Sequence, residues 1–181
     1  MNSDNMTDKN IDLCIKHIAD GDMLALKTLY EELRFPIYKF ALSIVKSTST
    51  AEDIAQETFL RIRVSAKSYR STGKPRAWIF SIVRNLAITE LRKTSKIINI
   101  EDYNNSLTTE GNNTFEIDEL SLLEILKPDE KEIVSLHVLA DLNHKDIAKA
   151  LNISYSQVRW KYSYAIKKLK KHLVLKGNSD K

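Results

Sequence analysis

Residues 143–171 read NHKDIAKALNISYSQVRWKYSYAIKKLKK. Apolar side chains recur at helical spacing over residues 144–151, which predicts a short helix. Asn152 follows, and Asn tolerates the left-handed backbone conformation that closes a helix and starts a tight turn. Ser154 is placed to cap a second helix. The stretch therefore predicts a helix-turn-helix.

The second helix of this pair has an apolar face and a basic face. Its inward positions are Val158, Tyr162, Ala165, Ile166 and Leu169, and its outward positions are Tyr155, Gln157, Arg159, Trp160, Lys161, Tyr164, Lys167, Lys168, Lys170 and Lys171. No Asp or Glu occurs from residue 154 to residue 176. Arg and Gln reach base edges in a major groove while Lys neutralises phosphate, so this pattern favours DNA recognition. The alternative is a solvated amphipathic helix of a bundle, which would not require Ala148, Asn152 and Val158 at these spacings.

The composition is typical of a helical intracellular protein. The 181 residues suffice for one domain or two small ones, 43% are hydrophobic, and there are only 4 Gly and 3 Pro. The formal net charge is +4, and the single cysteine, Cys14, cannot form an internal disulfide, which fits a reducing compartment. Since no signal peptide or membrane-spanning run is visible, we expect a soluble, cytoplasmic protein without membrane insertion.

Further helices are predicted near the N-terminus. Apolar residues repeat at helical spacing over residues 11–19, and Gly21 ends that helix. Asp22 can cap a second helix, which Pro36 kinks or restarts. A polar loop is expected over residues 46–50.

Residues 50–66, TAEDIAQETFLRIRVSA, predict a helix with an unusual outer face. One side is apolar, whereas the other groups Asp53, Gln56, Glu57 and Leu60. Asp53 alone is explained by a capping box with Thr50, since an acid near a helix N-terminus is stabilised by about 0.3–1 kcal/mol. An amide and an acid beside an exposed leucine favour a protein-docking face over plain solvation.

A basic loop, KSYRSTGK, is expected over residues 67–74. Its lysines, arginine and tyrosine suit contact with a nucleic-acid backbone or a splayed base, and a solvated loop is the alternative. Pro75 then opens a long helix in which Trp78 is expected in the core. Basic side chains occupy much of the remaining surface of that helix.

The helical pattern fails over residues 95–114, which are polar and rich in Asn and Thr. We interpret this stretch as an interdomain linker. Residues 115–126 are again helical in pattern, and Pro128 starts another helix with acids in its first turn. The expected fold is all-α, with two small helical domains joined by a flexible linker: 1–94, the linker 95–114, 115–176 and a tail at 177–181.

Residue sets for catalysis or metal binding are not found. The four histidines are dispersed and form no zinc pattern with Cys14. Neither a Gly-rich phosphate loop nor a nucleophile turn occurs, and no convergent acid, base and nucleophile set can be assembled. We therefore expect no enzyme activity, no metal and no cofactor.

Three segments together carry a family resemblance. AEDIAQETFLRI, PRAWIFSIVRNLAITELRK and, after a polar linker, PDEKEIVSLHVLADLNHKDIAKALNISYSQVRWKYSYAIKKLKKHL resemble the extracytoplasmic-function (group 4) branch of the sigma-70 family. The resemblance covers about residues 11–173. It implies an initiation factor of bacterial RNA polymerase with two helical domains, regions 2 and 4, joined by a flexible linker.

The resemblance also implies three sets of site residues. The motif D-x-x-Q-E-x-F is intact, which implies that the clamp helices of core RNA polymerase are bound by Asp53, Gln56, Glu57 and Leu60, with Phe59 mainly in the core. The melted minus-10 element would be held by Lys67, Tyr69, Arg70, Lys74, Arg76, Arg84 and Asn85. The minus-35 duplex would be read by Ser154, Tyr155, Gln157, Arg159, Trp160, Lys161, Ser163, Tyr164 and Lys167.

One position departs from the family pattern. Family members often show T-V-K-S-R in the second helix of region 4, where this chain has Gln157, Val158, Arg159, Trp160 and Lys161. Trp160 replaces a small polar residue at a DNA-facing position, so the pattern does not carry over a base sequence.

We therefore expect a transcription initiation factor whose partners are core RNA polymerase and promoter DNA. The resemblance also implies an anti-sigma factor as a further partner. One alternative is a helix-turn-helix regulator that binds duplex DNA independently, with an N-terminal sensing or dimerisation domain. Another is a DNA-processing enzyme, which would show metal-dependent cleavage or strand exchange.

Overall fold

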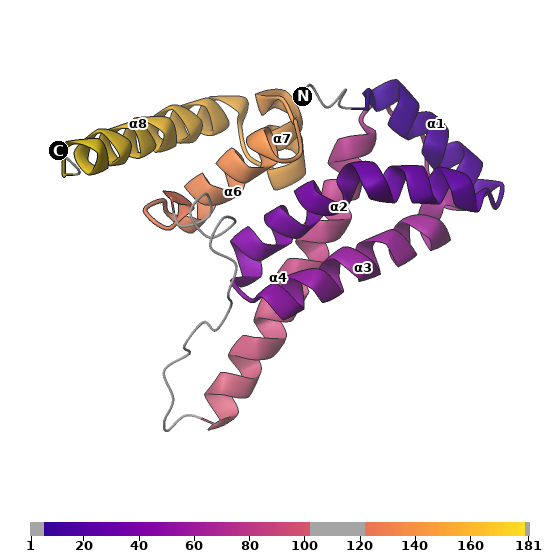
Figure 1. Ribbon diagram of the computed structural model, residues 1–181, viewed down its shortest axis with the longest axis horizontal. Helices are drawn as coiled ribbons and strands as arrows, with labels where there is room; N and C mark the ends of the chain where they lie inside the picture. The colour runs from indigo at the N-terminus through magenta and orange to yellow at the C-terminus, as the bar shows by residue number, and fades with distance from the viewer. Residues whose placement is uncertain (1–5, 102–121, 180–181) are drawn as a thin grey trace. The chain divides into compact units, whose positions relative to one another are not determined.

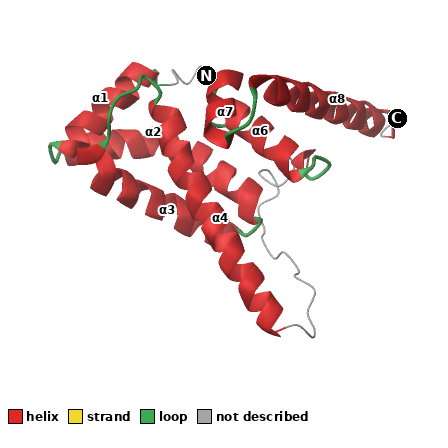
Figure 2. Cartoon of the chain, turned by 180° about the vertical axis from the view of Figure 1, so that it is seen from behind, coloured by secondary structure: helices red, strands yellow, loops and turns green. Residues whose placement is uncertain are grey.

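The computed structural model describes residues 6–101 and 122–179, with side chains over residues 6–94 and 122–175. The chain divides into two compact units, Met1–Thr109 and Glu110–Lys181. Helices and loops make up the described part of each unit, without strands (Figures 1 and 2). The predicted all-α fold class is confirmed, and the boundary between the units falls within the stretch expected to be the linker.

The N-terminal unit contains α1 (Asp8–Ala19), α2 (Met23–Val45), α3 (Thr48–Ser65), the 3-10 turn η1 (Ala66–Ser68) and α4 (Pro75–Glu101). Helix α2 packs against α1, α3 and α4, and Figure 1 shows α2 and α3 side by side. The Asp22 side chain caps α2 by accepting hydrogen bonds from the backbone N–H of Leu24 and Ala25, at 2.8 and 3.2 Å. Gly21 has a φ of 93° and completes the turn from α1.

The apolar faces of these four helices meet in one core. Its fully buried side chains include Ile11, Ile15, Leu29, Leu33, Ile37, Phe40, Ile62, Ile79 and Phe80. The rings of Phe40 and Phe80 pack edge to face, with centroids 5.4 Å apart. Phe59 is buried and packs against Tyr30 at 4.9 Å, which confirms its expected place in the core. This core holds α3 rigidly, with one face turned outward.

Three boundaries differ from those expected. Helix α2 is continuous through Pro36, so the restart expected there as one of two alternatives does not occur. Helix α3 begins at Thr48 because Ser47 is its N-cap, so the loop expected over residues 46–50 is much shorter. Helix α4 continues to Glu101, beyond the expected end at residue 94. Extending an existing helix requires no new nucleus, which lets α4 run into a polar sequence.

The C-terminal unit contains α6 (Pro128–Val138), α7 (His144–Leu151) and α8 (Tyr155–Ser179). Pro128 occupies the first turn of α6, as predicted. Asn143 caps α7, and Asn152 ends it in the left-handed conformation, with φ 53° and ψ 45°. The predicted helix-turn-helix is therefore confirmed with the expected bounds of its first helix.

Helix α8 lies against both α6 and α7. Val158 and Ala165 are fully buried, while Tyr162 and Leu169 are half-buried against a cluster that includes Leu126 and Val134. The buried Glu130 of α6 also contacts α8, because its carboxylate accepts a hydrogen bond from Lys168 Nζ at 2.7 Å. The inward positions predicted for α8 thus form its packing face.

Most of the helix expected over residues 115–126 lies outside the described residues. Within the described part, Leu122 and Leu123 are helical and residues 124–126 form a turn. Where the structure describes the chain, no helix is long and apolar enough to cross a membrane.

Candidate protein and nucleic-acid interfaces

The outer face of α3 presents the predicted docking residues together. Asp53 and Gln56 are exposed, Leu60 is 57% exposed and Val64, one turn further on, is 79% exposed. Glu57 is half-buried and accepts a hydrogen bond from Arg61 Nε at 2.8 Å. These side chains form one stripe, because residues three and four apart lie on the same helix face.

Helix capping does not explain this stripe. Ser47, not Thr50, is the N-cap of α3, and its Oγ accepts a hydrogen bond from Thr50 N at 3.4 Å. The interpretation of Asp53 as the partner of Thr50 in a capping box is therefore wrong. Asp53 lies in the second turn, where the helix dipole has weakened, so its exposed carboxylate has no capping role.

The second candidate surface is the loop between η1 and α4. Lys67, Arg70 and Lys74 are exposed around it. Tyr69 is half-buried: its hydroxyl donates to Asp12 Oδ1 at 2.5 Å, and its ring packs against Trp78 with centroids 4.6 Å apart. The loop thus displays cations around an aromatic pair that is fixed to the fold.

One residue expected at this surface, Arg76, makes structural contacts instead, and the residues on α4 differ in exposure. Arg76 is only 4% exposed, donates to Met6 O at 2.6 Å and pairs with Asp8 at 3.4 Å. The expectation that Arg76 contacts DNA is therefore corrected: its guanidinium holds the segment before α1. Trp78, expected in the core, is half-buried beneath Tyr69, whereas Arg84 is half-buried and Asn85 exposed on α4.

The third candidate surface is the outer face of α8. Arg159 and Ser163 are exposed, as are Trp160, Tyr164 and Lys167. The rings of Trp160 and Tyr164 are stacked, with centroids 5.5 Å apart and an interplanar angle of 4°. The Arg159 guanidinium carbon lies 5.9 Å from the centre of the Tyr155 ring. The face therefore combines a guanidinium, a flat aromatic pair and a lysine.

Other residues predicted on this face make contacts within the unit. Ser154 and Gln157 form a reciprocal cap, since Ser154 N donates to Gln157 Oε1 at 2.9 Å and Gln157 N donates to Ser154 Oγ at 3.2 Å. Lys161 is half-buried and pairs with Asp129 of α6. The outward position expected for Lys168 is also wrong, because it faces Glu130. The corrections for Lys161 and Lys168 have one cause: the acidic first turn of α6 packs against the basic helix.

Two histidines seven residues apart, His137 of α6 and His144 of α7, meet at Tyr162 of α8. The rings of His137 and His144 lie 5.1 Å apart, and each packs against Tyr162, at 4.8 and 4.7 Å. Burial lowers the pKa of His144, and the nearby His137 and Arg159 lower it further. Over residues 6–94 and 122–175, no group of three or more His, Cys, Asp and Glu side chains is placed to hold a metal ion.

Sequence reasoning missed Asp12 of α1, which bonds to the loop 57 positions away. It also missed Asp129 and Glu130 as partners of α8. Their position in the first turn of a helix is explained locally by the helix dipole, so nothing in the sequence separates a capping acid from a cross-helix partner.

Known protein families match both units. The family described as Sigma-70 region 2 matches residues 29–97, and Sigma-70, region 4 matches residues 122–171. Among curated proteins, the ECF RNA polymerase sigma factor SigM of Bacillus subtilis (strain 168) is 30% identical over 139 residues, covering 72% of this chain and 84% of SigM. SigX of the same organism is 25% identical over 162 residues, covering 81% of this chain and 82% of SigX.

Solved structures share the fold. CnrH, in complex with the cytosolic domain of CnrY, aligns with a TM-score of 0.66 at 19% identity, covering 92% of this chain and 98% of CnrH. RpoE of Bartonella quintana, in complex with the anti-sigma factor NepR, aligns with a TM-score of 0.67 at 22% identity, covering 81% of this chain and 95% of RpoE. Together with the family matches and the identity to SigM, these similarities show that the chain belongs to the ECF RNA polymerase sigma factors of the sigma-70 family.

Proposed function

We propose that this sigma factor binds core RNA polymerase through the outer face of α3 and directs it to a two-part promoter. Its α8 would read duplex DNA at minus-35, and the loop between η1 and α4 would hold melted DNA at minus-10. The observation that carries the proposal is the α3 stripe of exposed Asp53, Gln56 and Leu60 with the half-buried Glu57, on a helix whose other face is anchored in the core. Both DNA-binding roles depend on this docking step.

The α3 stripe has the chemistry of a protein interface. Leu60 is exposed to water, and burying a leucine side chain contributes about 1.5–3 kcal/mol to association. The surrounding carboxylates and amide offer acceptors and a donor that select a partner surface carrying complementary polar groups. The Glu57–Arg61 pair is a surface i,i+4 pair, which contributes about 0.3–0.5 kcal/mol to stability. Changing Glu57 should therefore affect binding more than folding.

The exposed face of α8 has the chemistry of major-groove readout. Arg159 is exposed, and its guanidinium can donate two parallel hydrogen bonds to a guanine edge. The stacked rings of Trp160 and Tyr164 offer an apolar surface of the kind that contacts thymine methyl groups. Lys167 is exposed further along the helix and suits a phosphate contact.

The loop between η1 and α4 has the chemistry of a single-strand surface. Lys67, Arg70 and Lys74 place positive charge around the half-buried pair of Tyr69 and Trp78. Unstacked bases are retained by aromatic faces together with cations that follow the backbone. Opening the duplex costs a few kcal/mol, so such contacts must offset it.

The test is promoter-directed melting. Core RNA polymerase would be incubated with the protein and random-sequence DNA, bound sequences would be selected, and unpaired thymines would be mapped with permanganate. We expect a selected sequence with two blocks, melted at the downstream block only when both proteins are present. If the protein alone binds duplex DNA at paired half-sites and polymerase adds no melting, the independent regulator replaces this proposal. Family membership does not favour that regulator.

The finer aspects of the proposal concern partners and location. We place its action in the cytoplasm with the polymerase, and we assign it no reaction of its own. CnrH and RpoE were each solved with a bound protein, the cytosolic domain of CnrY and the anti-sigma factor NepR. We propose that an anti-sigma factor binds and controls this chain as well. Such a partner should compete with core polymerase for this protein in a co-elution assay.

A further inference from the structure

The segment that leads into α1 is fastened to the start of α4. Met6 N donates to Glu32 Oε1 at 2.7 Å, and the Met6 carbonyl accepts from the Arg76 guanidinium at 2.6 Å. Arg76 also pairs with Asp8, the first residue of α1, at 3.4 Å. Because Arg76 lies in the first turn of α4, its two bonds fix the start of α1 to the downstream end of the loop, while the bond to Glu32 ties Met6 to α2.

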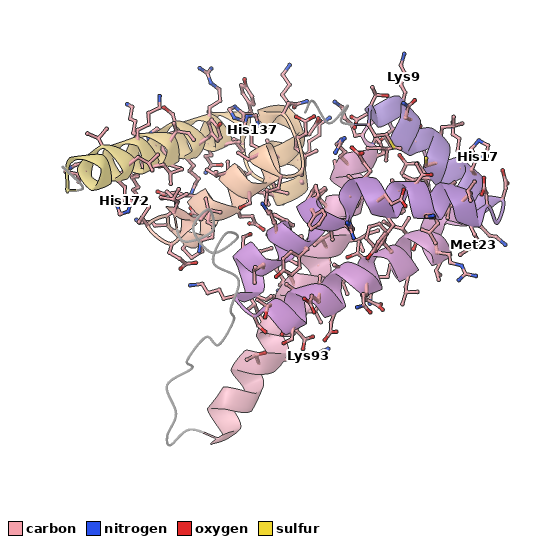
Figure 3. All side chains as sticks on the ribbon, in the orientation of Figure 1. Lys9, His17, Met23, Lys93, His137 and His172 are labelled. Carbon is pink, nitrogen blue, oxygen red and sulfur yellow. The ribbon has the colours of Figure 1, made fainter. Side chains whose placement is uncertain are left out.

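Asp12, one turn after Asp8 on α1, fastens the upstream half of the same loop. One carboxylate oxygen accepts from the Tyr69 hydroxyl at 2.5 Å, and the other accepts from the Ser71 hydroxyl. Lys9, between the two acids in sequence, points away from the unit (Figure 3). Helix α1 therefore turns its two acids toward the loop and the start of α4, and Lys9 toward solvent.

The protonation states of this contact agree with its geometry. Partial burial opposes ionisation of Asp12, but the hydrogen bonds from Ser71 and Tyr69, together with the charge of Lys16, outweigh it and lower the pKa of Asp12. Burial raises the pKa of Tyr69, and its bond to the Asp12 carboxylate raises that pKa further. At neutral pH, Asp12 is thus an acceptor on both oxygens and Tyr69 is a donor.

Backbone geometry shows that the loop has a defined shape between these anchors. Gly73 has a φ of 70°, and a Cβ built there would meet nothing within 4 Å. The glycine is therefore required by the backbone turn and not by a lack of space. Lys74 lies directly after this turn and Arg70 lies between the two residues that bond to Asp12, so the positions of both cations depend on how the loop is held.

We propose that Asp12 is a positioning residue for the capture of single-stranded promoter DNA, holding Tyr69 and Ser71 so that the exposed cations of the loop are arranged to receive it. This inference rests on the proposed role of the loop at minus-10. Asp12 itself need not touch DNA. Its carboxylate restricts the conformations of the loop before DNA binds. The loop therefore loses less conformational entropy on binding, which is how preorganisation raises affinity.

The test uses the full chain bound to core RNA polymerase and a forked DNA selected by that holoenzyme, duplex at minus-35 and single-stranded at minus-10. Asp12→Asn keeps the shape of the side chain and removes its charge, and we expect about tenfold weaker binding of the fork, the scale of one lost charged hydrogen bond. Binding of core polymerase and of the minus-35 duplex alone should not change. Asp20→Asn, an exposed acid at the other end of α1, is the charge-matched control and should leave fork binding unchanged.

Two further readouts separate positioning from a general loss of structure. In a Trp160→Phe background, the fluorescence of Trp78 reports the packing of Tyr69, so Asp12→Asn should alter its emission while the melting temperature of the unit stays within a few degrees. Tyr69→Phe and Ser71→Ala should each weaken fork binding. Combining Tyr69→Phe with Asp12→Asn should weaken fork binding by less than the sum of the two single changes, because both act on the contact between Tyr69 and residue 12.

The outcomes distinguish this inference from the function on which it rests. If the wild-type holoenzyme does not prefer the fork over the fully duplex DNA, the proposed minus-10 role of the loop fails, and the inference fails with it. If the wild type prefers the fork and Asp12→Asn binds it equally well or more tightly, the minus-10 role stands and Asp12 is not a positioning residue.

Discussion

Arg159 is exposed on the outer face of α8, with its guanidinium over the Tyr155 ring. Arg159→Ala should weaken binding of the minus-35 duplex by about 1–3 kcal/mol and relax the base preference at one position, because a bidentate contact to a base is lost. The measurement is competition binding against duplexes that carry each base change in turn.

Lys167→Ala supplies the matched comparison on the same helix. A phosphate contact carries no base information, so this variant should weaken binding to all duplexes equally. It should also reduce the slope of the logarithm of the binding constant against the logarithm of salt concentration by about one. An Arg159→Ala protein that loses affinity equally for every sequence would remove Arg159 from the set of base-reading residues.

The side chains of α8 also show what a single sequence can and cannot reveal. The helical spacing of apolar residues in α8 distinguished the buried Val158 and Ala165 from the exposed Trp160, because burial follows the helical repeat. The same period also placed Lys161 and Lys168 outward. Their acidic partners lie on α6, 32 and 38 positions away, and such a distance is set by packing between helices.

At the scale of elements, the pairing of α6 with α8 makes the C-terminal unit sensitive to acid. Glu130 has a 5% exposed side chain that meets Lys168, which is 24% exposed. Burial opposes ionisation of Glu130, but the hydrogen bonds from Lys168 and Lys127 N outweigh it, so the pKa of Glu130 is lowered. The Asp129 pKa is also lowered, chiefly by its hydrogen bond with Lys161.

The sign of the pH effect follows from these lowered pKa values. Near pH 4 the unfolded chain binds more protons at Glu130 than the folded chain does, so the stability that this carboxylate contributes is complete above its unfolded pKa of about 4.3 and is lost as the pH falls toward the lower folded value. Glu130→Gln should reduce the free energy of unfolding by about 1.5–3 kcal/mol at pH 7, and by progressively less below pH 4.5.

The measurement is denaturant unfolding of both proteins between pH 7 and pH 3.5, followed by the fluorescence of Trp160 in a Trp78→Phe background. Glu132→Gln, two residues further along α6, is the control with the same chemical change. A difference between wild type and Glu130→Gln that is constant over this pH range would show that the Glu130–Lys168 pair does not stabilise the folded unit.

Elements were predicted best where a local signal defined them. The left-handed Asn152, the cap Asp22 and the helix-opening prolines Pro75 and Pro128 each act over a few residues, and all four were confirmed. The start of α3 was misplaced because Ser47 and Thr50 are both competent caps, and only the packed helix distinguishes them.

At the scale of the whole molecule, the order of segments carried more information than any one of them. The helix with Asp53, Gln56 and Glu57 and the later helix-turn-helix fall in separate units, as the resemblance implied. The fastening of the loop to α1 through Asp12 was not predictable, because no periodicity links two positions 57 residues apart. Long-range polar contacts of this kind depend on the assembled bundle and not on local sequence.

The central claim is that this chain docks on core RNA polymerase through the outer face of α3. The most direct test is size-exclusion co-elution with bacterial core RNA polymerase, comparing wild type with Gln56→Ala/Glu57→Ala and with Leu60→Ala. Glu90→Ala on α4, which removes a surface acid paired with Lys93 at 2.9 Å, is the control. All variants should keep the wild-type far-ultraviolet circular dichroism, since none of these side chains belongs to the core.

We expect stoichiometric co-elution of the wild type and the Glu90→Ala protein, and loss of most of the complex for the two α3 variants, since truncation of central interface residues costs 2 kcal/mol or more, roughly a thirtyfold loss of affinity. Co-elution of the α3 variants at the wild-type level would contradict the proposed docking face. A wild-type protein that elutes apart from the polymerase would contradict the account as a whole.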